Sequence, residues 1–398
     1  MLHVCISYPS AFVYILCICI SILHLSQGSY EAACPCDDEQ WCQPIDGPPV
    51  RSTGEIYGFY GSWVNPNGLP PGLDMNWTHV TTVAWADQDA VMCLAHKHGA
   101  RAVIGCPAIN LDKLLDESGR VEWIKDALHQ VQSQFRDGIV FDYESPQPHG
   151  SLQGQTYAAL VAETRDAFHT ANPSLQVTTC VPWSPDAIDG RDYPFQDLAD
   201  ASDLLYVMDY DTRSQIFDAC IAGANAPLPG MIQGMERWFT LDIDPAKIVL
   251  GVPWYGYRYP CLSGTKPDAV YCPIKSVPFR EVNCSDAAGI EVSYADIRST
   301  LSSTDAVTTG GLRRDSNTGS LFFNAVDSNA VVFQYWFDDP ISLEAKYSWA
   351  RAHGVGGVGP FVFRNLDPVD AMVDAIAMWK TFDVFFDVPF ATVKNDIE

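Results

Sequence analysis

The chain has 398 residues, 47% of them hydrophobic, so it is too long and too apolar for a disordered tail or a fold held only by disulfides. It carries 24 Lys and Arg against 49 Asp and Glu, a formal net charge of −25 at pH 7. This excess of negative charge excludes nucleic acid as the default partner and leaves neutral or cationic ligands open.

The N-terminal segment has the pattern of a secretory signal. The first 28 residues contain no Asp, Glu, Lys or Arg, and residues 11–25 are almost all apolar before the small residues Ser26 and Gly28. We therefore predict a signal peptide over residues 1–28. Because its first part lacks Lys and Arg, an uncleaved membrane anchor is the alternative. No later segment has the pattern of a membrane span, so no membrane association is expected after cleavage.

Ten cysteines follow the predicted signal peptide, and an even number in an oxidising compartment favours disulfides. Three of them lie in a Cys-rich N-terminal segment over residues 29–54: Cys34, Cys36 and Cys42. Zinc binding is the alternative there, but no second Cys/His pair follows at metal-ligand spacing. We therefore expect no metal site.

Three further cysteines lie in one loop-like stretch that short-range bridges would stabilise: Cys261, Cys272 and Cys284. A secretory route also makes two acceptor sequons candidates for N-glycosylation, at Asn76 and Asn283. The sequon at Asn76 is favoured, because Asn283 precedes a cysteine that is expected in a disulfide.

From residue 55 onward, short β-rich runs alternate with amphipathic stretches. Eight runs are present, at residues 56–63, 79–86, 101–108, 138–144, 176–183, 204–210, 247–257 and 355–363. Near-continuously apolar strands separated by helices indicate a parallel sheet covered on its outside. Eight such units predict an α/β fold, a closed (β/α)₈ TIM barrel over residues 55–385. A doubly wound open sheet is the alternative.

Helical periodicity flanks the fourth run. One apolar stripe precedes it, at Val121, Ile124, Leu128, Val131 and Phe135, and a second follows it, at Tyr157, Leu160, Val161, Thr164 and Phe168. The eighth run begins too far after the seventh for a single crossover. We therefore predict an insertion at about residues 258–340 between these strands, and a C-terminal tail over residues 386–398.

In such a barrel the chemistry lies at the carboxyl ends of the strands. The residues there are mostly aromatic or acidic: Asp142, Glu144, Trp183, Asp209, Tyr210, Asp211, Trp254, Tyr255 and Tyr257. Scarcely a basic residue stands among them. This composition is typical of a sugar site, where ring faces stack on aromatic side chains and hydroxyls meet carboxylates.

The fourth run carries the most chemical information. Along a strand, positions 140, 142 and 144 point to the same side, so Asp142 and Glu144 are expected to face one cavity. Two close carboxylates tend to split into a protonated acid and an ionised stabiliser, as acetal cleavage requires. The alternative is a strand-end pair that binds a metal or is simply solvated.

The segment 137–144 (DGIVFDYE) resembles the DxxDxDxE signature of glycoside hydrolase family 18, the chitinase family. Residues 208–211 (MDYD) resemble that family's MxYD element, and residues 251–257 (GVPWYGY) its seventh-strand segment. Further motifs are similar in order and spacing to family members that act on chitobiose. The resemblance covers roughly residues 34–380.

The resemblance implies a substrate-assisted retaining mechanism without a cofactor. Glu144 would be the general acid and later the base. Asp142 would accept a hydrogen bond from the 2-acetamido N–H of the substrate and stabilise an oxazolinium-like intermediate. The Tyr210 hydroxyl would orient the attacking carbonyl oxygen.

The resemblance also implies residues that bind substrate. Asp211 would bind sugar hydroxyls, and four aromatic residues would contact sugar rings: Trp183, Trp254, Tyr257 and Phe361. For Trp183, Trp254 and Tyr257, a place in the barrel core is the alternative. Phe361 departs from the family, which usually has a Trp as the floor of the sugar site.

A second departure is Val140, where many chitinases have a further Asp. Without that acid to share a proton, Asp142 is expected to remain ionised in mildly acidic solution.

The implied function is cleavage of GlcNAc-β-1,4-GlcNAc linkages in chitobiose-type oligosaccharides during catabolism of the glycan core of glycoproteins. The expected partners are N-acetylglucosamine oligosaccharides, and the enzyme is expected to be monomeric and lysosomal or secreted. A secreted chitinase on polymeric chitin and a non-catalytic chitin-binding lectin are the alternatives. Retention of Asp142, Glu144 and Tyr210 argues against the lectin.

Overall fold

The computed structural model describes residues 33–64, 70–303, 310–366 and 372–387. The predicted signal peptide (1–28) and residues 388–398 of the predicted tail lie outside these residues. No helix within the described ranges is long and apolar enough to cross a membrane.

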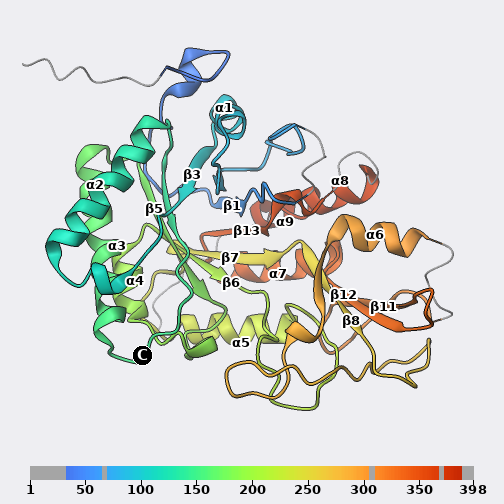
Figure 1. Ribbon diagram of the computed structural model, residues 1–398. Coiled ribbons are helices and arrows are strands. Elements are labelled where there is room, and N and C mark those ends of the chain that lie inside the picture. The colour runs from blue at the N-terminus through green and yellow to red at the C-terminus, as the bar shows by residue number, and fades with distance from the viewer. Residues whose placement is uncertain (1–32, 65–69, 304–309, 367–371, 388–398) are drawn as a thin grey trace, which may run out of the picture. The chain divides into compact units, whose positions relative to one another are not determined.

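Eight parallel strands close into a barrel, which confirms the predicted fold class (Figure 1). Around the barrel their order is β1-β13-β7-β6-β5-β4-β3-β2. The strands are β1 (Glu55–Phe59), β2 (Thr82–Ala84), β3 (Arg101–Gly105), β4 (Gly138–Phe141), β5 (Gln176–Pro182), β6 (Leu204–Met208), β7 (Ile248–Pro253) and β13 (Gly357–Phe361). Seven of them lie within one of the predicted runs, and β1 begins one residue before its run.

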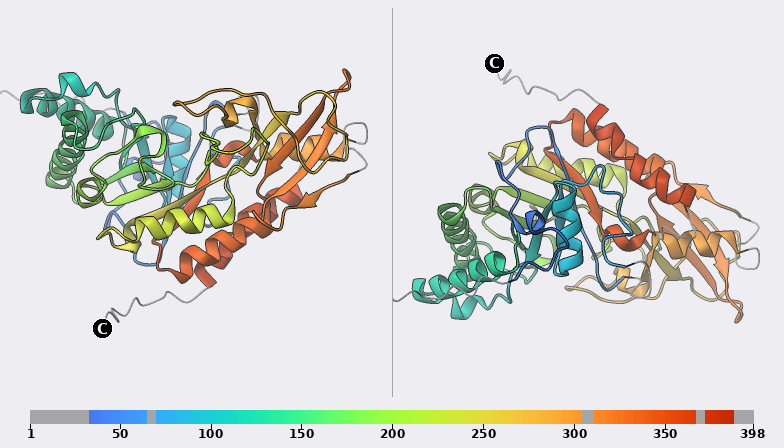
Figure 2. Two further views of the ribbon diagram at one scale, coloured as in Figure 1. Left: turned by 90° about the horizontal axis from the view of Figure 1, so that it is seen from below. Right: turned by 90° about the horizontal axis from the view of Figure 1, so that it is seen from above.

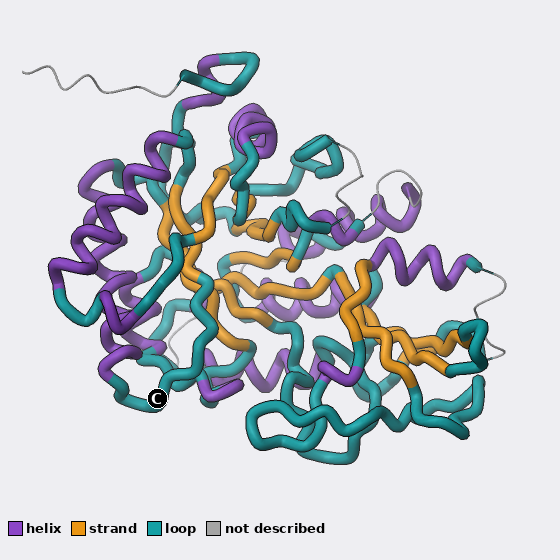
Figure 3. Tube along the Cα trace, viewed as in Figure 1, coloured by secondary structure: helices purple, strands orange, loops and turns teal. Residues whose placement is uncertain are grey.

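Helices cover the outside of the barrel, as the tube in Figure 3 shows. They are α1 (Asp89–Lys97), α2 (Glu117–Ser133), α3 (Leu152–Ala171), α4 (Phe195–Ala201), α5 (Leu228–Trp238), α7 (Pro340–Ala352), α8 (Met372–Lys380) and α9 (Asp383–Asp387). Side chains cap the starts of α2, α3 and α7: Asp116 accepts a hydrogen bond from the Gly119 N–H, Ser151 accepts one from the Gly154 N–H, and Asp339 accepts one from the Ser342 N–H.

The two predicted apolar stripes lie on α2 and α3. All five stripe residues of α3 are buried. On α2, Ile124 and Val131 are buried, but Val121 is 56% exposed and Phe135 lies beyond the end of the helix. The stripe on α2 is therefore narrower than predicted, since only its middle faces the barrel.

Alternation along each strand separates two cores. On β4, Ile139 and Phe141 pack outward against the helices, whereas Val140 belongs to the cluster inside the barrel. That inner cluster also holds large aromatic side chains, among them Tyr57 and Tyr206, so side chains fill the barrel below its mouth.

The seventh predicted run is two strands. It breaks at Trp254, and the chain continues as β8 (Tyr255–Pro260), which leaves the barrel. β8 joins a five-stranded sheet of order β10-β11-β12-β8-β9. The other strands and the helix of this insertion are β9 (Ile290–Ser293), α6 (Tyr294–Ser302), β10 (Arg313–Arg314), β11 (Leu321–Val326) and β12 (Val332–Phe337).

The predicted insertion is thus confirmed, but its first strand begins at Tyr255 rather than near residue 258. In both views of Figure 2 the orange strands of this sheet lie on the side of the barrel away from the green helices α2 and α3.

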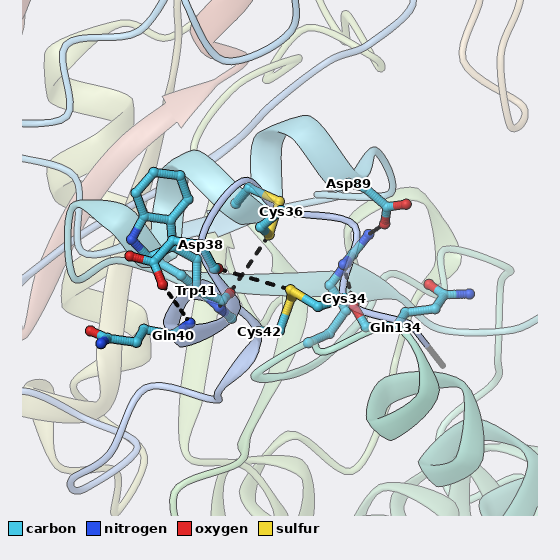
Figure 4. Close-up of a disulfide and its surroundings, with 11 residues drawn as sticks. Cys34, Cys36, Asp38, Gln40, Trp41, Cys42, Asp89 and Gln134 are labelled. Carbon is cyan, nitrogen blue, oxygen red and sulfur yellow. Dashed lines mark hydrogen bonds and ion pairs between the residues drawn. A yellow bond between two sulfur atoms is a disulfide. The ribbon is translucent and has the colours of Figure 1, made fainter. Parts of the chain in front are cut away.

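Four disulfides form within the described residues: Cys34–Cys42, Cys36–Cys93, Cys220–Cys284 and Cys261–Cys272. Figure 4 shows Cys34, Cys36 and Cys42 beside the short helix η1 (Glu39–Cys42). At the start of this helix, Asp38 accepts a hydrogen bond from the Gln40 N–H. The cysteines weighed as zinc ligands are therefore bridged. Only Cys261–Cys272 is a short bridge within the loop, since Cys284 pairs with Cys220 on another loop.

Two of the ten cysteines, Cys106 and Cys180, keep free thiols. They stand on either side of β4, after β3 and within β5, so β4 separates them.

Candidate active site

The acidic pair lies where β4 ends. The strand stops at Phe141, and Asp142 and Glu144 follow on an irregular segment rather than on the strand itself. Val140 is fully buried inside the barrel, as the predicted register requires. Asp142 lies above this filled interior. Its Oδ1 atom is buried and has no hydrogen-bond partner in the part of the chain that the structure describes.

Burial, and after it the nearby charge of Glu144, raises the pKa of Asp142 to about 7. The Cys180 thiol and the Arg191 guanidinium act oppositely without cancelling this effect. The expectation that Asp142 remains ionised in mildly acidic solution is therefore wrong, because it weighed a missing neighbour at position 140 and left out the cost of burying a charge.

A cavity of about 180 Å³ opens beside this pair. It is lined by residues from the loops after β4, β5 and β6 and from the insertion: Glu144, Trp183, Asp189, Arg191, Met208, Tyr210, Asp211, Ser214, Tyr257 and Asp286. Five of the predicted site residues, Glu144, Trp183, Tyr210, Asp211 and Tyr257, thus meet at one cavity, and Asp142 is electrostatically coupled to Glu144.

Tyr210 follows β6 and is 8% exposed. Its ring stacks on Phe361 with 5.2 Å between centroids, so two predicted site residues are in contact. Burial raises the pKa of the Tyr210 hydroxyl well above its ordinary value. The hydroxyl therefore stays protonated and can donate a hydrogen bond into the cavity.

Asp211 is held by the insertion. Its Oδ1 accepts hydrogen bonds from the hydroxyls of Tyr255, at 2.6 Å, and Tyr257, at 3.0 Å. Its backbone N–H donates to Oδ1 of Asn225, and its φ of +52° places it in the left-handed region. Burial raises the pKa of Asp211, while the two tyrosine hydroxyls lower it.

The aromatic predictions divide. Trp183 lines the cavity with an indole N–H that has no partner among the described residues. Tyr257 also lines it, but its ring is buried against Tyr259 and its hydroxyl serves Asp211, so it offers no open face for a sugar. Phe361, at the end of β13, remains partly exposed at the mouth.

Trp254 does not belong to the site. It is 1% exposed and packs among Phe363, Trp379 and Phe382 in the outer core. The alternation that turns its neighbours inward turns Trp254 toward the helices, so its predicted role in sugar binding is wrong.

Asp209 is likewise not among the residues that line the cavity, although its chain neighbours Met208 and Tyr210 are. It is 1% exposed, and burial together with Asp338 raises its pKa to about 7 against the opposing charge of Lys346.

Two aromatic residues at the mouth escaped the prediction. Trp63 is 55% exposed and lies 5.1 Å from Trp85 between ring centroids, and Trp85 lies 5.7 Å from Phe361. Together they form an aromatic platform, which we define as Trp63, Trp85 and Phe361. Because Trp63 and Trp85 follow the ends of β1 and β2, the rule that found Asp142 would also have found them.

Charged residues of the cavity were missed as well. They are Arg191, Asp189 and Asp286. Asp189 lies in the short helix η3 (Ile188–Gly190) and Asp286 in η5 (Asp286–Ala288), away from the strand ends where site residues were sought. Burial, and then the charge of Asp211, raises the pKa of Asp286 to about 7.

Both predicted glycosylation sequons lie outside the site. The Asn283 side chain is exposed, and its neighbour Cys284 is in a disulfide, as expected. Asn76 is half-buried, and its Oδ1 accepts a hydrogen bond from the Thr78 N–H.

A closed barrel with a coupled pair of carboxyl groups and open aromatic rings at its mouth is the arrangement of an enzyme that cleaves glycosidic bonds. The protein is a glycosidase.

The chain belongs to glycosyl hydrolase family 18, whose family model matches residues 110–363. It is 35% identical to di-N-acetylchitobiase of Homo sapiens over 354 residues, which cover 88% of this chain and 87% of that protein. It is 36% identical to probable di-N-acetylchitobiase 2 of Dictyostelium discoideum over 362 residues, 89% of this chain and 91% of the relative.

Solved structures agree on the fold. A mutant family 18 chitinase from Cycas revoluta in complex with (GlcNAc)4 superposes with a TM-score of 0.64 at 20% identity, covering 82% of this chain and 99% of the other. The Group IV chitinase of Ostrinia furnacalis in complex with allosamidin gives a TM-score of 0.67 at 18% identity, covering 83% and 98%.

The placement of Trp254 yields a test. Trp254→Ala removes a large side chain from the outer core and should lower the free energy of unfolding by about 3–5 kcal/mol. Trp183→Ala, its counterpart at the cavity, should cost less stability and raise KM. Denaturant unfolding and steady-state kinetics on both variants measure the difference. If Trp254→Ala left the free energy of unfolding unchanged and raised KM, Trp254 would be a substrate-binding residue and its assignment to the core would be wrong.

Proposed function

We propose that the enzyme hydrolyses the GlcNAc-β-1,4-GlcNAc linkage of chitobiose-type oligosaccharides by a substrate-assisted retaining mechanism. The observation that carries this proposal is the meeting of Glu144 and Tyr210 at one cavity, beside the buried Asp142. The similarity over most of the chain to proteins named di-N-acetylchitobiase supports the choice of substrate.

In the first step, the carbonyl oxygen of the substrate's 2-acetamido group attacks C1 and the bond from C1 to the glycosidic oxygen breaks. Glu144 gives its proton to the leaving oxygen. The Asp142 carboxylate accepts a hydrogen bond from the acetamido N–H and balances the positive charge of the oxazolinium ion. The Tyr210 hydroxyl orients the carbonyl oxygen.

In the second step, water adds to C1 from the side that the leaving group vacated, and the bond from C1 to the acetamido oxygen breaks, which restores the acetamido group. Glu144, now ionised, takes a proton from this water and returns to its starting form. Two displacements at C1 leave the anomeric configuration retained.

The rest of the mouth supplies binding. The aromatic platform offers ring faces for sugars, with Trp63 the most open of its members. Asp211, oriented by two tyrosine hydroxyls, is placed to accept hydrogen bonds from sugar hydroxyls. The indole N–H of Trp183 provides a donor for the substrate.

The proposed cellular role is breakdown of the glycan core of glycoproteins by a monomeric enzyme. A signal peptide over residues 1–28 would direct the chain to the lysosome or out of the cell.

The first test of this function is turnover. Purified enzyme should hydrolyse chitobiose and longer chito-oligomers with retention, assigned by NMR of the first anomer formed. Glu144→Gln keeps the shape but removes the proton, so kcat should fall about 10²- to 10⁴-fold with ligand binding preserved.

The matched control is Glu163→Gln. Like Glu144, which pairs with Arg191, Glu163 forms an ion pair with an Arg: it contacts Arg120 at 2.7 Å. Glu163 lies on α3, however, outside the cavity. The Glu163→Gln variant should retain wild-type turnover. Full activity in Glu144→Gln would remove Glu144 from its role, and binding without turnover in the wild type would favour a lectin.

The internal nucleophile gives a second test. An oligomer of glucosamine or glucose lacks the acetamido carbonyl that acts as the nucleophile in the proposed mechanism, so its rate should fall below detection. Comparison of kcat/KM for the acetylated and de-N-acetylated oligomers measures this. Similar rates on both would refute substrate assistance.

The pKa of Asp142 predicts the pH dependence. A carboxyl group with a raised pKa is protonated below that pKa and loses its proton as the pH rises. Above about pH 7 the pair of Asp142 and Glu144 therefore has no proton for the leaving oxygen, and kcat/KM should fall across that pH.

Two variants assign this alkaline limb. Asp142→Asn cannot titrate, so its residual activity should lack the step near pH 7. Asp209→Asn is the control, because the pKa of Asp209 is also about 7 although it does not line the cavity. A limb that survives in Asp142→Asn and vanishes in Asp209→Asn would show that the wrong carboxyl group was chosen.

A further inference from the structure

Glu144 forms an ion pair at the cavity. Its Oε2 accepts a hydrogen bond from Nη1 of Arg191 at 2.5 Å. The two side chains differ in their surroundings, since that of Glu144 is 55% exposed and that of Arg191 only 7%. The guanidinium is therefore the fixed partner, and the carboxylate is the one with room to move.

Arg191 is itself anchored. It follows the short helix η3 (Ile188–Gly190), where its Nη2 contacts Oδ2 of Asp189 at 3.2 Å and its Nε donates to the Ile188 carbonyl at 3.3 Å. Oδ1 of Asp189 accepts a hydrogen bond from the Ser214 hydroxyl at 2.8 Å. This connected set joins the loop after β5 to the loop after β6 and holds the guanidinium at one place on the cavity wall.

The charge balance makes this contact distinctive. Among the residues that line the cavity in the described structure, Arg191 is the one Lys or Arg, against the carboxyl groups of Glu144, Asp189, Asp211 and Asp286. The titratable groups that face Glu144 come from three strand ends: Asp142, Cys180, Arg191, Tyr193, Tyr210 and Asp211. Only the guanidinium among them carries positive charge.

We propose that Arg191 is a positioning residue that holds Glu144 as an ionised partner in the free enzyme and releases it when substrate fills the cavity. This inference rests on the proposed function, in which Glu144 is the general acid. A carboxylate in an ion pair with a guanidinium has no proton to give, so Glu144 must leave Arg191 before it can protonate the glycosidic oxygen.

The proton has a source within the site. Burial leaves Asp142 protonated below about pH 7. Transfer from Asp142 to Glu144 converts one carboxylic acid and one carboxylate into the reverse pair, so the number of protons does not change. It produces the ionised Asp142 and the protonated Glu144 that the first step requires. Arg191 stays with Asp189, which keeps the guanidinium paired.

The test is the pH profile of kcat/KM in variants of Arg191. Without the positive charge, the pair of Asp142 and Glu144 should hold its proton to higher pH, so Arg191→Gln should move the alkaline limb upward by about one pH unit. It should also lower kcat several-fold at the acidic plateau, because Glu144 loses its fixed position. Arg191→Met repeats the loss of charge with an apolar side chain, in case the Gln variant folds poorly. Arg191→Lys keeps the charge and should return the limb toward the wild-type position.

Arg237→Gln is the matched control. Arg237 pairs with Asp186, on the same loop as Arg191, but both partners are about half exposed and neither lines the cavity. Its removal should leave the profile unchanged. If the Arg191→Gln and Arg191→Met variants lose the same factor of activity at every pH, with the limb in place, Arg191 only supports the fold and the proposal is wrong.

A second measurement does not depend on turnover. In substrate-free enzyme, the side-chain carboxyl ¹³C resonance of Asp142, assigned by its loss in Asp142→Asn, should titrate at higher pH in Arg191→Gln than in the wild type, because the charge of Arg191 lowers the pKa of Asp142. An unchanged midpoint would overturn the role of Arg191 even in an active enzyme. If the variant shows this shift but the wild type cleaves no chito-oligomer, the proposed function is refuted instead.

Discussion

Closure of the barrel by the pairing of β13 with β1 is the constraint on which the remaining structure depends. It places eight carboxyl ends around one mouth above an interior filled by side chains, with Tyr57 and Tyr206 among the largest. Asp142 stands at the top of this filling, and its proton affinity follows first from burial and then from the charge of Glu144.

Three carboxyl groups at the mouth of the barrel are accommodated in three different ways. Asp142 is neutral at acidic pH because burial disfavours its ionised form. Asp211 is stabilised by two tyrosine hydroxyls that donate to the same oxygen. Glu144 has a cation beside it. Carboxyl groups that lie close together are thus kept in different electrostatic environments. One site can therefore contain a proton donor, a carboxylate that stabilises positive charge and an acceptor for sugar hydroxyls.

The sequence contained the barrel because strand alternation and helix periodicity are local properties. Ile139, Val140 and Phe141 point out, in and out as their pattern predicts. The ring of Trp254 was assigned to the wrong side although the same alternation applies to it, since Leu250, Val252 and Trp254 all pack in the outer core. Trp63 and Trp85 were within reach of the rule about strand ends. Arg191 was not, since its significance lies in a contact with Glu144 across 47 positions of the chain.

The direct continuation of β7 into β8 has a consequence for how this barrel can vary. One residue separates a strand of the barrel wall from the strand that carries Tyr255 and Tyr257, and those hydroxyls fix a carboxylate on the neighbouring loop after β6. The insertion is therefore not an independent unit that can be exchanged without effect on the site. Replacement of β8 would remove Tyr257 from the cavity wall, and replacement of the chain beyond Pro260 would remove Asp286 from the same wall and break the Cys220–Cys284 disulfide to the loop after β6. Variation that spares the cavity is thus confined to the parts of the insertion that contribute neither, such as the hairpin of β11 and β12.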